Sequence, residues 1–403
     1  MTIRELRIRG FRSLRDVTWR PGRLNVLIGA NASGKSNLLR ALELLQAAAA
    51  GDFDKKVLAM GGMGPLLWDG TAEAAEWELE VDPILPEDPY WNPRPTPIEY
   101  RLRLEPVPHF AEGRVVQEDL FDFQPSREMK GSHEPFYYLR RGLDFATVWE
   151  PNKREMIPLG GQRRATQPML SDLRASSFIH PVASSFRGYM EEFGIHQYLR
   201  TDPDADVRRA TVARYEKRLD PEGLNLVNVL ATLYNGDRGF EEAVNRNMRA
   251  AFGRDFEKLV FGPASDQRIN MRLRWQSLNR QMSAADLSDG TLRFLMLNAI
   301  LENPAPGSLA AIDEPETGLH PHMLPIVAEM ARAAAERTQV LLTTHSPDLL
   351  DLFPADDPPT VTVARLEDGA TRLDALDPED LKRWLADYRL GEIFRSRGLE
   401  AMA

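Results

Sequence analysis

The sequence predicts an α/β fold with an antiparallel β lobe and a compact, mainly helical inserted arm. Three observations support this prediction. A strand, a glycine loop and a helix follow one another in residues 24–50. Apolar and polar residues alternate with strand periodicity through much of residues 73–150, and helices and buried strands alternate again from residue 287 to about residue 363. The 403 residues are enough for two or three structural units.

The elements follow in order along the chain. Leu24–Ile28 is a short buried run that ends at Gly29, and apolar residues recur with helical spacing from Ser36. Residues 206–219 and 224–233 are periodic segments that predict helices. We therefore expect five segments, namely the first part of an α/β head (1–71), an antiparallel β lobe (72–160), a helical insert (161–252), the second part of the head (253–365) and a C-terminal helical cap (366–403).

Composition excludes some classes of protein. The 50 Lys and Arg residues against 60 Asp and Glu residues give a net charge of −10, so no bulk basic charge indicates nucleic acid. The absence of Cys excludes a disulfide framework, a thiolate nucleophile and Cys-ligated metal, and it suits a reducing compartment. Because the first residues lack the apolar core of a signal peptide and no stretch approaches about 18 apolar residues, we expect a cytoplasmic protein with no membrane segment.

Residues 29–36, Gly-Ala-Asn-Ala-Ser-Gly-Lys-Ser, fit the pattern G-x-x-x-x-G-K-[ST] between a strand and a helix. Successive backbone N–H groups and a helix N-terminus form an anion site in such a loop. Lys35 supplies a positive charge for the β and γ phosphates of a nucleotide, and the Ser36 hydroxyl is a ligand for Mg²⁺. The alternative, a chance glycine turn, is disfavoured by this context.

Three later segments carry candidate site residues. Leu309–Ile312 is an apolar strand that ends in Asp313 and Glu314, a pair suited to holding Mg²⁺ and orienting water. By themselves these acids are an ordinary strand end. Leu287–Thr291 precedes an apolar helix and is by itself an N-cap with Ser288 or Asp289 capping. A buried strand delivers His345 to its carboxyl end, where a lone His is more often structural.

Together, in this order, the segments resemble the ATPase heads of the ABC superfamily, in its SMC, RecF and OLD branch. The Leu287–Phe294, Asp313–Pro321 and Thr343–Pro347 segments are most similar to the stand-alone bacterial AAA_21 ATPases, which are OLD-like and lack a Toprim domain. The resemblance implies an ABC-type P-loop NTPase head that binds ATP and Mg²⁺ and hydrolyses ATP in a homodimer with shared sites. It assigns these roles: catalytic, Glu314, His345 and Lys35; nucleotide-binding, Gly29, Asn31, Ser33, Gly34, Lys35, Ser36, Asn37 and Arg12; signature acting on the partner's ATP, Ser288, Asp289 and Gly290; metal, Ser36 and Asp313.

The chain departs from the family pattern in the segment after the glycine loop. No glutamine falls in a recognisable Q-loop, since Gln46 still lies on the predicted helix, so the metal-linked glutamine of the family stays unassigned. The insert lacks heptads, which predicts a compact arm rather than a long coiled coil. Clusters of Arg in this insert suit either DNA phosphates or, as we favour for the second, a solvated mixed-charge face; they are Arg163 with Arg164, and Arg208, Arg209, Arg214, Lys217 and Arg218 on one expected helix.

Three functions remain open at this point. The first is an ATPase that couples its nucleotide state to DNA or to a separate effector such as a nuclease, in genome maintenance or phage defence. The second is a nucleotide-gated scaffold that recruits a nuclease or toxin with little turnover, which an intact Glu314 disfavours. The third, a transporter ATPase subunit, is disfavoured by the long insert and by the missing Q-loop.

Overall fold

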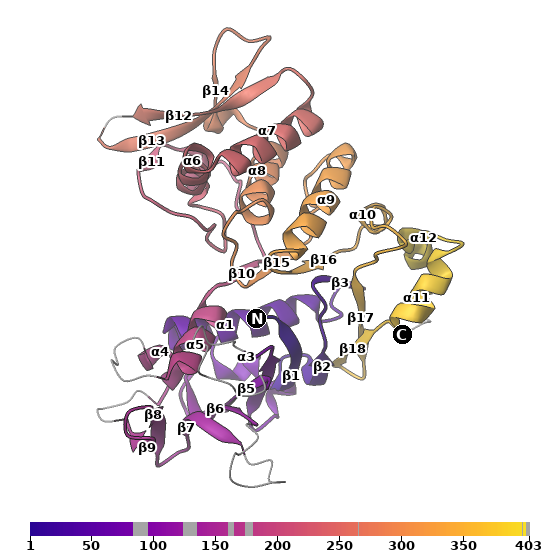
Figure 1. Ribbon diagram of the computed structural model, residues 1–403. Coiled ribbons are helices and arrows are strands. Elements are labelled where there is room, and N and C mark those ends of the chain that lie inside the picture. Colours follow the sequence, from indigo (N-terminus) through magenta and orange to yellow (C-terminus); the bar gives the residue numbers. More distant parts are fainter. Residues whose placement is uncertain are drawn as a thin grey trace. The chain divides into compact units, whose positions relative to one another are not determined.

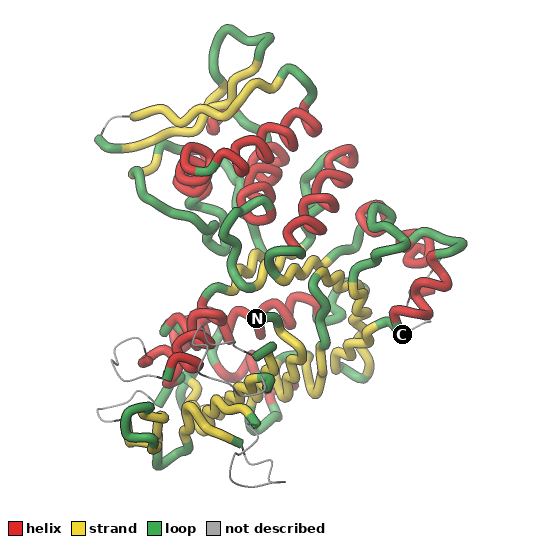
Figure 2. Tube along the Cα trace, in the orientation of Figure 1, coloured by secondary structure: helices red, strands yellow, loops and turns green. Residues whose placement is uncertain are grey.

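The computed structural model describes residues 1–83, 96–123, 135–159, 165–173, 180–264, 266–396 and 398–399. Figures 1 and 2 show the course of the chain and its helices and strands. The chain forms two compact units, each built from segments distant in sequence. Unit 1 comprises Met1–Gly22, Ala30–Phe193 and Ala364–Ala375, and unit 2 comprises Arg23–Gly29, Gly194–Val363 and Leu376–Ala403.

Unit 1 contains an eight-stranded antiparallel sheet in the order β2-β1-β4-β5-β6-β7-β8-β9. Its strands are β1 (Ile3–Phe11), β2 (Leu14–Trp19), β4 (Ala75–Val81), β5 (Ile98–Pro106), β6 (Gly113–Asp122), β7 (Phe136–Arg141), β8 (Ala146–Glu150) and β9 (Glu155–Pro158). The strict alternation of β4 and β5 buries one face and leaves the other half-exposed, which confirms the predicted antiparallel lobe. Strand β2 was not predicted, because its buried residues Leu14, Val17 and Trp19 do not alternate strictly.

Helices cover the buried side chains of this sheet. They are α1 (Lys35–Ala50), α2 (Phe53–Ala59), α3 (Met63–Leu66), η1 (Trp68–Gly70), α4 (Met169–Asp172) and α5 (Pro181–Glu191). Phe186 of α5 packs on Tyr100 of β5, with 5.4 Å between the ring centroids. Helix α1 follows Gly34 and is capped at its C-terminus by Gly51 in the left-handed conformation. The predicted helix after the glycine loop is thus confirmed.

Unit 2 has a sheet in the order β10-β15-β16-β3-β17, in which β15, β16 and β3 run parallel. The strands are β3 (Leu24–Gly29), β10 (Phe193–His196), β15 (Leu309–Asp313), β16 (Gln339–Thr343) and β17 (Thr360–Glu367), which leads on to β18 (Ala370–Ala375) in unit 1. Helices of this unit are α8 (Asp289–Leu301), α9 (Leu324–Ala335), α10 (Pro347–Leu350), α11 (Pro378–Leu385) and α12 (Leu390–Arg395), with the short turns η4 (Ala284–Asp286) and η5 (Pro321–Met323). The strands predicted at 309–312 and 340–342 are confirmed.

A second, antiparallel sheet in unit 2 packs on two helices. Its strands are β11 (Thr211–Val212), β12 (Phe256–Ala264), β13 (Arg268–Trp275) and β14 (Met282–Ser283), and β13 pairs with the other three. The helices are α6 (Leu226–Gly236) and α7 (Arg238–Phe252), which lie beside the sheet in Figure 1. Leu259, Met271 and Leu273 are buried in the core that includes these helices. The helix expected at 224–233 is therefore confirmed.

The helix expected at residues 206–219 is wrong. Only the short turn η3 (Asp206–Arg208) is helical there, and Thr211–Val212 pairs with β13 as the edge strand β11. The β-branched pair gains backbone hydrogen bonds from β13 that outweigh a weak helical pattern with few buried apolar residues. The cationic residues from Arg208 to Arg218 thus do not share one helix face. Within the described parts of the chain, no helix is both long enough and apolar enough to cross a membrane.

Candidate functional site

The glycine loop is shaped by residues of left-handed conformation and by a close neighbour. Strand β3 ends at Gly29, and Ala32 and Gly34 have φ values of 65° and 99°. A Cβ atom at Gly34 would collide with the Thr371 side chain, so a residue other than glycine is excluded there. Thr371 Oγ1 also donates a hydrogen bond of 2.9 Å to the Ser33 carbonyl, which fixes the loop from outside.

The glycine loop carries polar groups that can donate hydrogen bonds to an anionic ligand. Lys35 is buried, and its Nζ donates to the Ala30 carbonyl at 3.1 Å. The Ser33 hydroxyl is buried and has no hydrogen-bond partner among the described residues. Asn37 donates to the Ser13 hydroxyl at 2.8 Å and so supports the loop, while Asn31 is exposed and Ser36 half-exposed on it. A phosphate is a better partner for these donors than a neutral carbonyl.

Arg12 lies in the same unit, at the turn between β1 and β2. Its φ is 49°, its guanidinium donates to the Met60 carbonyl at 3.2 Å, and its buried Nε has no partner in the described structure. Burial and the nearby Arg40 guanidinium lower the pKa of Arg12. A half-buried cation that contacts a carbonyl instead of a carboxylate suits an anionic ligand.

In unit 2, the carboxyl ends of β10, β15, β16 and β3 form what we call the carboxyl edge. Asp313 lies in register with Thr343, whose hydroxyl donates to the Asp313 carboxylate. The Thr344 N–H donates to the Leu27 carbonyl at 3.2 Å, so β16 lies directly beside the strand that leads to Gly29. The first residue of the glycine loop, on β3, and the predicted metal ligand Asp313, on β15, thus lie on either side of β16 at one edge.

Glu314 and His345 meet at this edge. His345 Nε2 lies 3.5 Å from Glu314 Oε1, and the two side chains are 31% and 43% exposed. Glu314 has a φ of 46°, and its N–H donates to the Thr343 carbonyl at 3.1 Å. Its carboxylate also accepts a hydrogen bond from the Thr317 hydroxyl at 3.2 Å. A left-handed backbone at a non-glycine residue is held by these contacts and is typical of functional turns.

Two residues of the edge were not among the predicted site residues. Glu316 accepts hydrogen bonds from the Thr344 hydroxyl at 2.5 Å and from the His345 N–H at 3.2 Å, so it positions the turn that carries His345. Burial raises the pKa of Glu316. Gln197, directly after β10, lines a pocket of about 140 Å³ together with Asp313 and Glu314. The only sequence signal for Gln197 is a short apolar run before it, which gives no indication that β10 lies beside β15.

The predicted signature segment, Leu287–Thr291, forms the N-terminus of α8. The Ser288 hydroxyl caps the helix by accepting from the Thr291 N–H at 3.2 Å. A Cβ atom at Gly290 would lie 2.6 Å from the Gly318 carbonyl, so only glycine fits. The Ser288 side chain and the helix N-terminus thus sit on a rigid support, which is the arrangement needed to donate to a phosphate.

Arg208 holds this segment from the neighbouring turn η3. Its guanidinium donates to the Leu287 carbonyl at 2.7 Å, to Asp289 Oδ1 at 2.5 Å and to the Thr201 carbonyl at 2.9 Å. The Arg208 side chain is only 11% exposed, whereas the Asp289 side chain is 65% exposed. The extra carboxylate that Asp289 brings to the signature is therefore matched by a buried cation. Nothing in the sequence pattern indicated this contact, because the two residues are 81 positions apart.

The sequence also predicted a possible DNA contact at Arg163 and Arg164 and a metal site. Arg163 and Arg164 lie outside the described residues. Among the described residues, no group of three or more His, Asp or Glu side chains gathers as a metal site.

Comparisons with known protein families match two parts of this chain to AAA domains. Residues 167–351 match the family described as "AAA domain, putative AbiEii toxin, Type IV TA system", and residues 1–78 match the family described as "AAA ATPase domain". A comparison with curated proteins gave no match.

Two solved structures of Smc heads are similar to this chain. One, the SmcHead bound to the C-winged helix domain of ScpA, has a TM-score of 0.53 and 16% identity, and the match covers 94% of this chain and 99% of the other. The second is the Smc head domain with an extended coiled coil bound to the C-terminal domain of ScpA derived from Pyrococcus furiosus. Its TM-score is 0.55 and its identity 15%, with 96% of this chain and 99% of the other covered. At such identities the likeness establishes the fold, and it confirms the predicted fold class.

Proposed function

We propose that this chain, whose AAA ATPase matches and Smc-head fold support the ABC/SMC-type ATPase superfamily, binds ATP and hydrolyses it in a homodimer. The observation that carries the proposal is the carboxyl edge of unit 2. There the strand leading to Gly29 lies beside the strand that ends before His345, and Glu314 pairs with His345. A carboxylate and an imidazole at the end of such a strand suit the activation of water.

Each residue has a role in this proposal. The loop N–H groups and Lys35 hold the phosphates, with Arg12, Asn31, Ser33 and Asn37 lining or supporting the loop. Ser36 and Asp313 are the residues that would hold Mg²⁺, and the bound ion would neutralise charge on the phosphates. The amide oxygen of Gln197 is an additional candidate metal ligand at the same edge. We assign Gln197 as the metal-linked glutamine of the Q-loop, which the sequence does not identify. Glu314 orients and deprotonates water, and His345 holds the developing charge.

The dimer follows from the signature segment. Ser288 and the N-terminus of α8 present donors that belong to a phosphate of the partner copy's ATP, with Arg208 neutralising Asp289. ATP then bridges the two copies, and hydrolysis removes the bridge. We propose that this cycle is coupled to DNA or to an effector protein in genome maintenance or phage defence. The toxin–antitoxin wording of one matched family supports the effector alternative.

A pair of substitutions tests the proposal. Lys35→Ala removes the cation of the loop, and we expect it to abolish ATP binding measured by equilibrium dialysis. Glu314→Gln keeps the size of the side chain but removes the base, so ATP binding persists while turnover falls by about 10²–10⁴-fold. The Glu314→Gln protein should also elute as a dimer with ATP in size-exclusion chromatography.

The matched control is Glu329→Gln, the same change at an exposed position of α9. It should leave ATP binding, turnover and elution at wild-type values. Wild-type turnover in Glu314→Gln would remove the base from the mechanism, and ATP binding by Lys35→Ala with unchanged affinity would remove the nucleotide site itself. A Glu314→Gln protein that binds ATP but stays a monomer would contradict the ATP-bridged homodimer.

A further inference from the structure

One face of the β12–β13 sheet carries an unusual set of cations. The buried face of this sheet presents Leu259, Met271 and Leu273 to α6 and α7. Because directly paired residues share a face, the register Lys258 with Arg274, Val260 with Arg272 and Ala264 with Arg268 fixes what the opposite face presents. We call the basic face the set of exposed cations Lys258, Arg268, Arg272, Arg274 and Arg280.

Among the described residues, one acid forms an ion pair with this set of five cations. Arg274 pairs with Glu257 at 2.9 Å, and Arg268 donates to the Ala210 carbonyl. Lys258 and Arg280 have no polar partner within the described structure, although Asp266 lies at the hairpin turn. Lys258 is the direct cross-strand partner of Arg274, an arrangement of like charges that is destabilising. Apart from the Glu257 ion pair, the described part of the sheet leaves the positive charge of this face without a neutralising acid.

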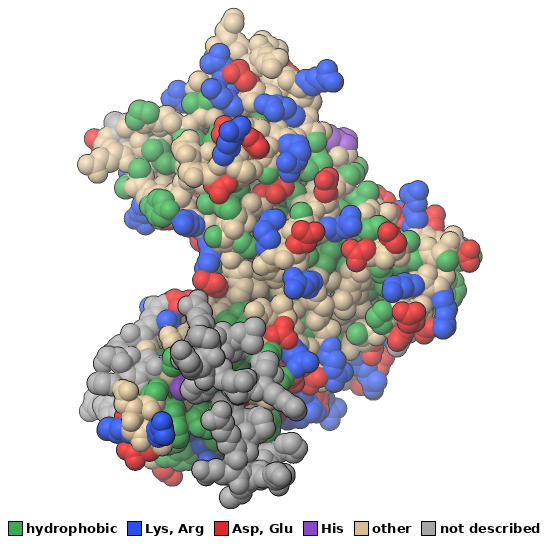
Figure 3. Space-filling model, viewed as in Figure 1, with side chains coloured by type: hydrophobic (Ala, Val, Ile, Leu, Met, Phe, Trp, Pro, Cys, Tyr) green, Lys and Arg blue, Asp and Glu red, His purple; other side chains and the backbone are tan. Residues whose placement is uncertain are grey.

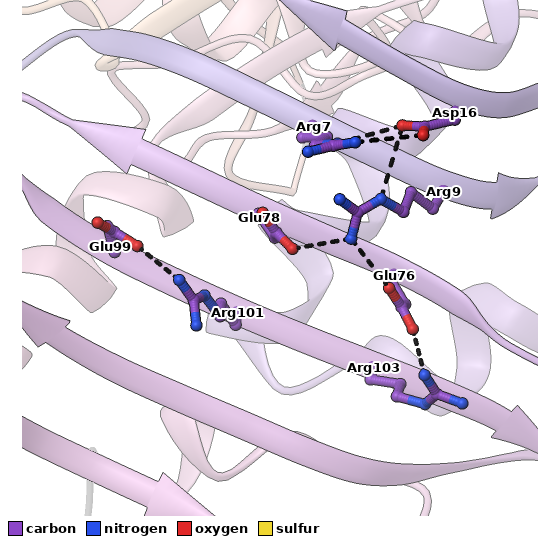
Figure 4. A network of polar contacts seen from close by, with 8 residues as sticks. All are labelled: Arg7, Arg9, Asp16, Glu76, Glu78, Glu99, Arg101 and Arg103. Carbon is purple, nitrogen blue, oxygen red and sulfur yellow. Dashed lines mark hydrogen bonds and ion pairs between the residues drawn. The ribbon is translucent and has the colours of Figure 1, made fainter.

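The antiparallel sheet of unit 1 shows that this cost is avoidable. There each arginine is opposite an acid: Arg9 pairs in register with Glu76, Glu76 with Arg103, and Glu78 with Arg101. Figure 4 shows the resulting chain of ion pairs along β1, β4 and β5, with Asp16 on β2. Exposed arginines on strands thus have acids opposite them in the sheet of unit 1, whereas in the second sheet Arg268 and Arg272 form no ion pair among the described residues.

The spacing of the basic face indicates the kind of ligand. From Arg268 to Arg274 the strand advances six residues, about 20 Å at ~3.3 Å per residue. Arg272, Arg274 and Arg280 also line a hollow of about 470 Å³ with Leu278, Asn279 and Gln281. A single phosphate would need convergent donors, whereas cations spread over this length match an extended polyanion. In the region of α9, α11 and α12, the face drawn in Figure 3 shows Lys and Arg side chains interspersed with Asp and Glu side chains.

The absence of aromatic rings from the basic face separates two kinds of nucleic acid. By the strand register, the buried face of the described part of this sheet carries the aromatic side chains Phe256, Phe261 and Trp275. Single-stranded nucleic acids are usually bound by stacking of bases on exposed aromatic rings, whereas duplex binding without sequence preference depends on phosphate contacts. We propose that the basic face binds the phosphate backbone of duplex DNA. This rests on the proposed function only in naming the partner to which the ATPase is coupled.

The test measures DNA affinity against salt. A fluorescent duplex of about 30 base pairs is titrated in an anisotropy assay without nucleotide, at several KCl concentrations. The test protein is the triple variant Arg272→Gln, Arg274→Gln and Arg280→Gln. The control is the triple variant Arg7→Gln, Arg9→Gln and Arg103→Gln, which removes the same charge from the compensated sheet of unit 1.

We expect the test variant to bind at least about tenfold more weakly. We also expect it to lose about 2.7 from the slope of log K against log salt, at ~0.9 per phosphate contact. The control variant should keep the wild-type slope. Equal losses in both triple variants, an unchanged slope in the test variant, or tighter binding of single-stranded DNA or polyglutamate than of the duplex would each overturn the proposal.

Two further measurements keep the outcome clear. Lys258→Gln and Arg280→Gln, single changes at exposed residues without partners in the described structure, should each lower the slope by about 0.9 without affecting folding. Basal ATP turnover without DNA should be unchanged in all basic-face variants. If the wild-type protein showed no ATP turnover, the proposed function would be wrong. If the wild-type protein hydrolysed ATP but did not bind duplex DNA, only the proposal for the basic face would be wrong.

Discussion

The two units of this molecule use charged side chains in different ways. In unit 1, the acids and bases of the sheet contact one another: Arg9 lies 3.1 Å from Glu78, and the buried Glu118 is surrounded by donors. In unit 2, Glu314 and His345 meet at a half-exposed edge, and Arg274 is the one basic-face cation that forms an ion pair among the described residues. Charges that are satisfied within the fold support the structure, and charges that are left open are available to ligands. The comparison predicts that changes in the antiparallel sheet of unit 1 affect stability, whereas changes at the carboxyl edge or the basic face of unit 2 affect chemistry or binding.

The largest expected effect on stability is at Glu118. This side chain is fully buried and accepts hydrogen bonds from the Tyr100 hydroxyl and the Leu170 N–H, each at 2.9 Å, and from the Met169 N–H. Burial raises the pKa of Glu118, against the effect of these donors. Glu118→Ala leaves the donors buried and unpaired, and we expect unfolding in urea to become easier by about 3 kcal/mol or more.

Glu118→Gln is the matched control, because its amide keeps an oxygen acceptor of the same size. We expect it to cost about 1 kcal/mol, with ATP turnover per folded molecule unchanged in both variants. If turnover fell while the urea transition stayed in place, Glu118 would belong to the chemistry, and the division between the units would fail.

The next effect is at Arg208 in unit 2, whose guanidinium joins Leu287 and Asp289 to the turn η3. Hydrogen bonds from a charged group contribute about 1.5–3 kcal/mol each. If their loss removes a similar free energy from the stabilisation of the transition state, turnover falls about tenfold or more. We expect Arg208→Ala to keep the ATP affinity of the monomer, because the signature is proposed to act on the partner's ATP.

Arg209→Ala provides the control, because Arg209 is next to Arg208 in the chain but makes different contacts. The Arg209 side chain is 58% exposed, and among the described residues its guanidinium pairs only with Asp204. Turnover should be measured against protein concentration for both variants. A role in positioning the signature predicts that the Arg208→Ala defect is largest at low concentration, where few dimers form. A loss of ATP affinity equal to the loss of turnover would instead indicate a general structural defect.

The sequence was sufficient for those parts of the site that follow from local order. Gly29–Ser36 lies between a strand and a helix, and the strand before Asp313 is an apolar run, so each could be located without its neighbours. Ser288 as an N-cap followed from the apolar helix behind it. These features depend on residues within one turn or one strand.

What depends on distant parts of the chain could not be predicted. Gln197 joins the site only because β10 lies beside β15, more than a hundred residues later. The helix expected at 206–219 failed for the same reason, since β13 supplies the hydrogen bonds that make Thr211–Val212 a strand. The basic face, likewise, requires the register of two strands, because the sequence alone does not show that Lys258 lies opposite Arg274.

The smallest effects provide the closest test of the comparison, because they exchange the charge patterns of the two sheets. Lys258→Glu turns the like-charge pair with Arg274 into an opposite pair, and we expect stability to rise by about 0.5–1 kcal/mol while DNA affinity falls. Glu78→Lys in unit 1 faces Arg7 and Arg101 in register, so stability should fall by about the same amount with no change in DNA affinity. Both shifts in the urea midpoint should shrink at high salt, where exposed charges are screened. If Lys258→Glu destabilised the protein as much as Glu78→Lys does, the open charges of the basic face would be part of the fold rather than reserved for a ligand.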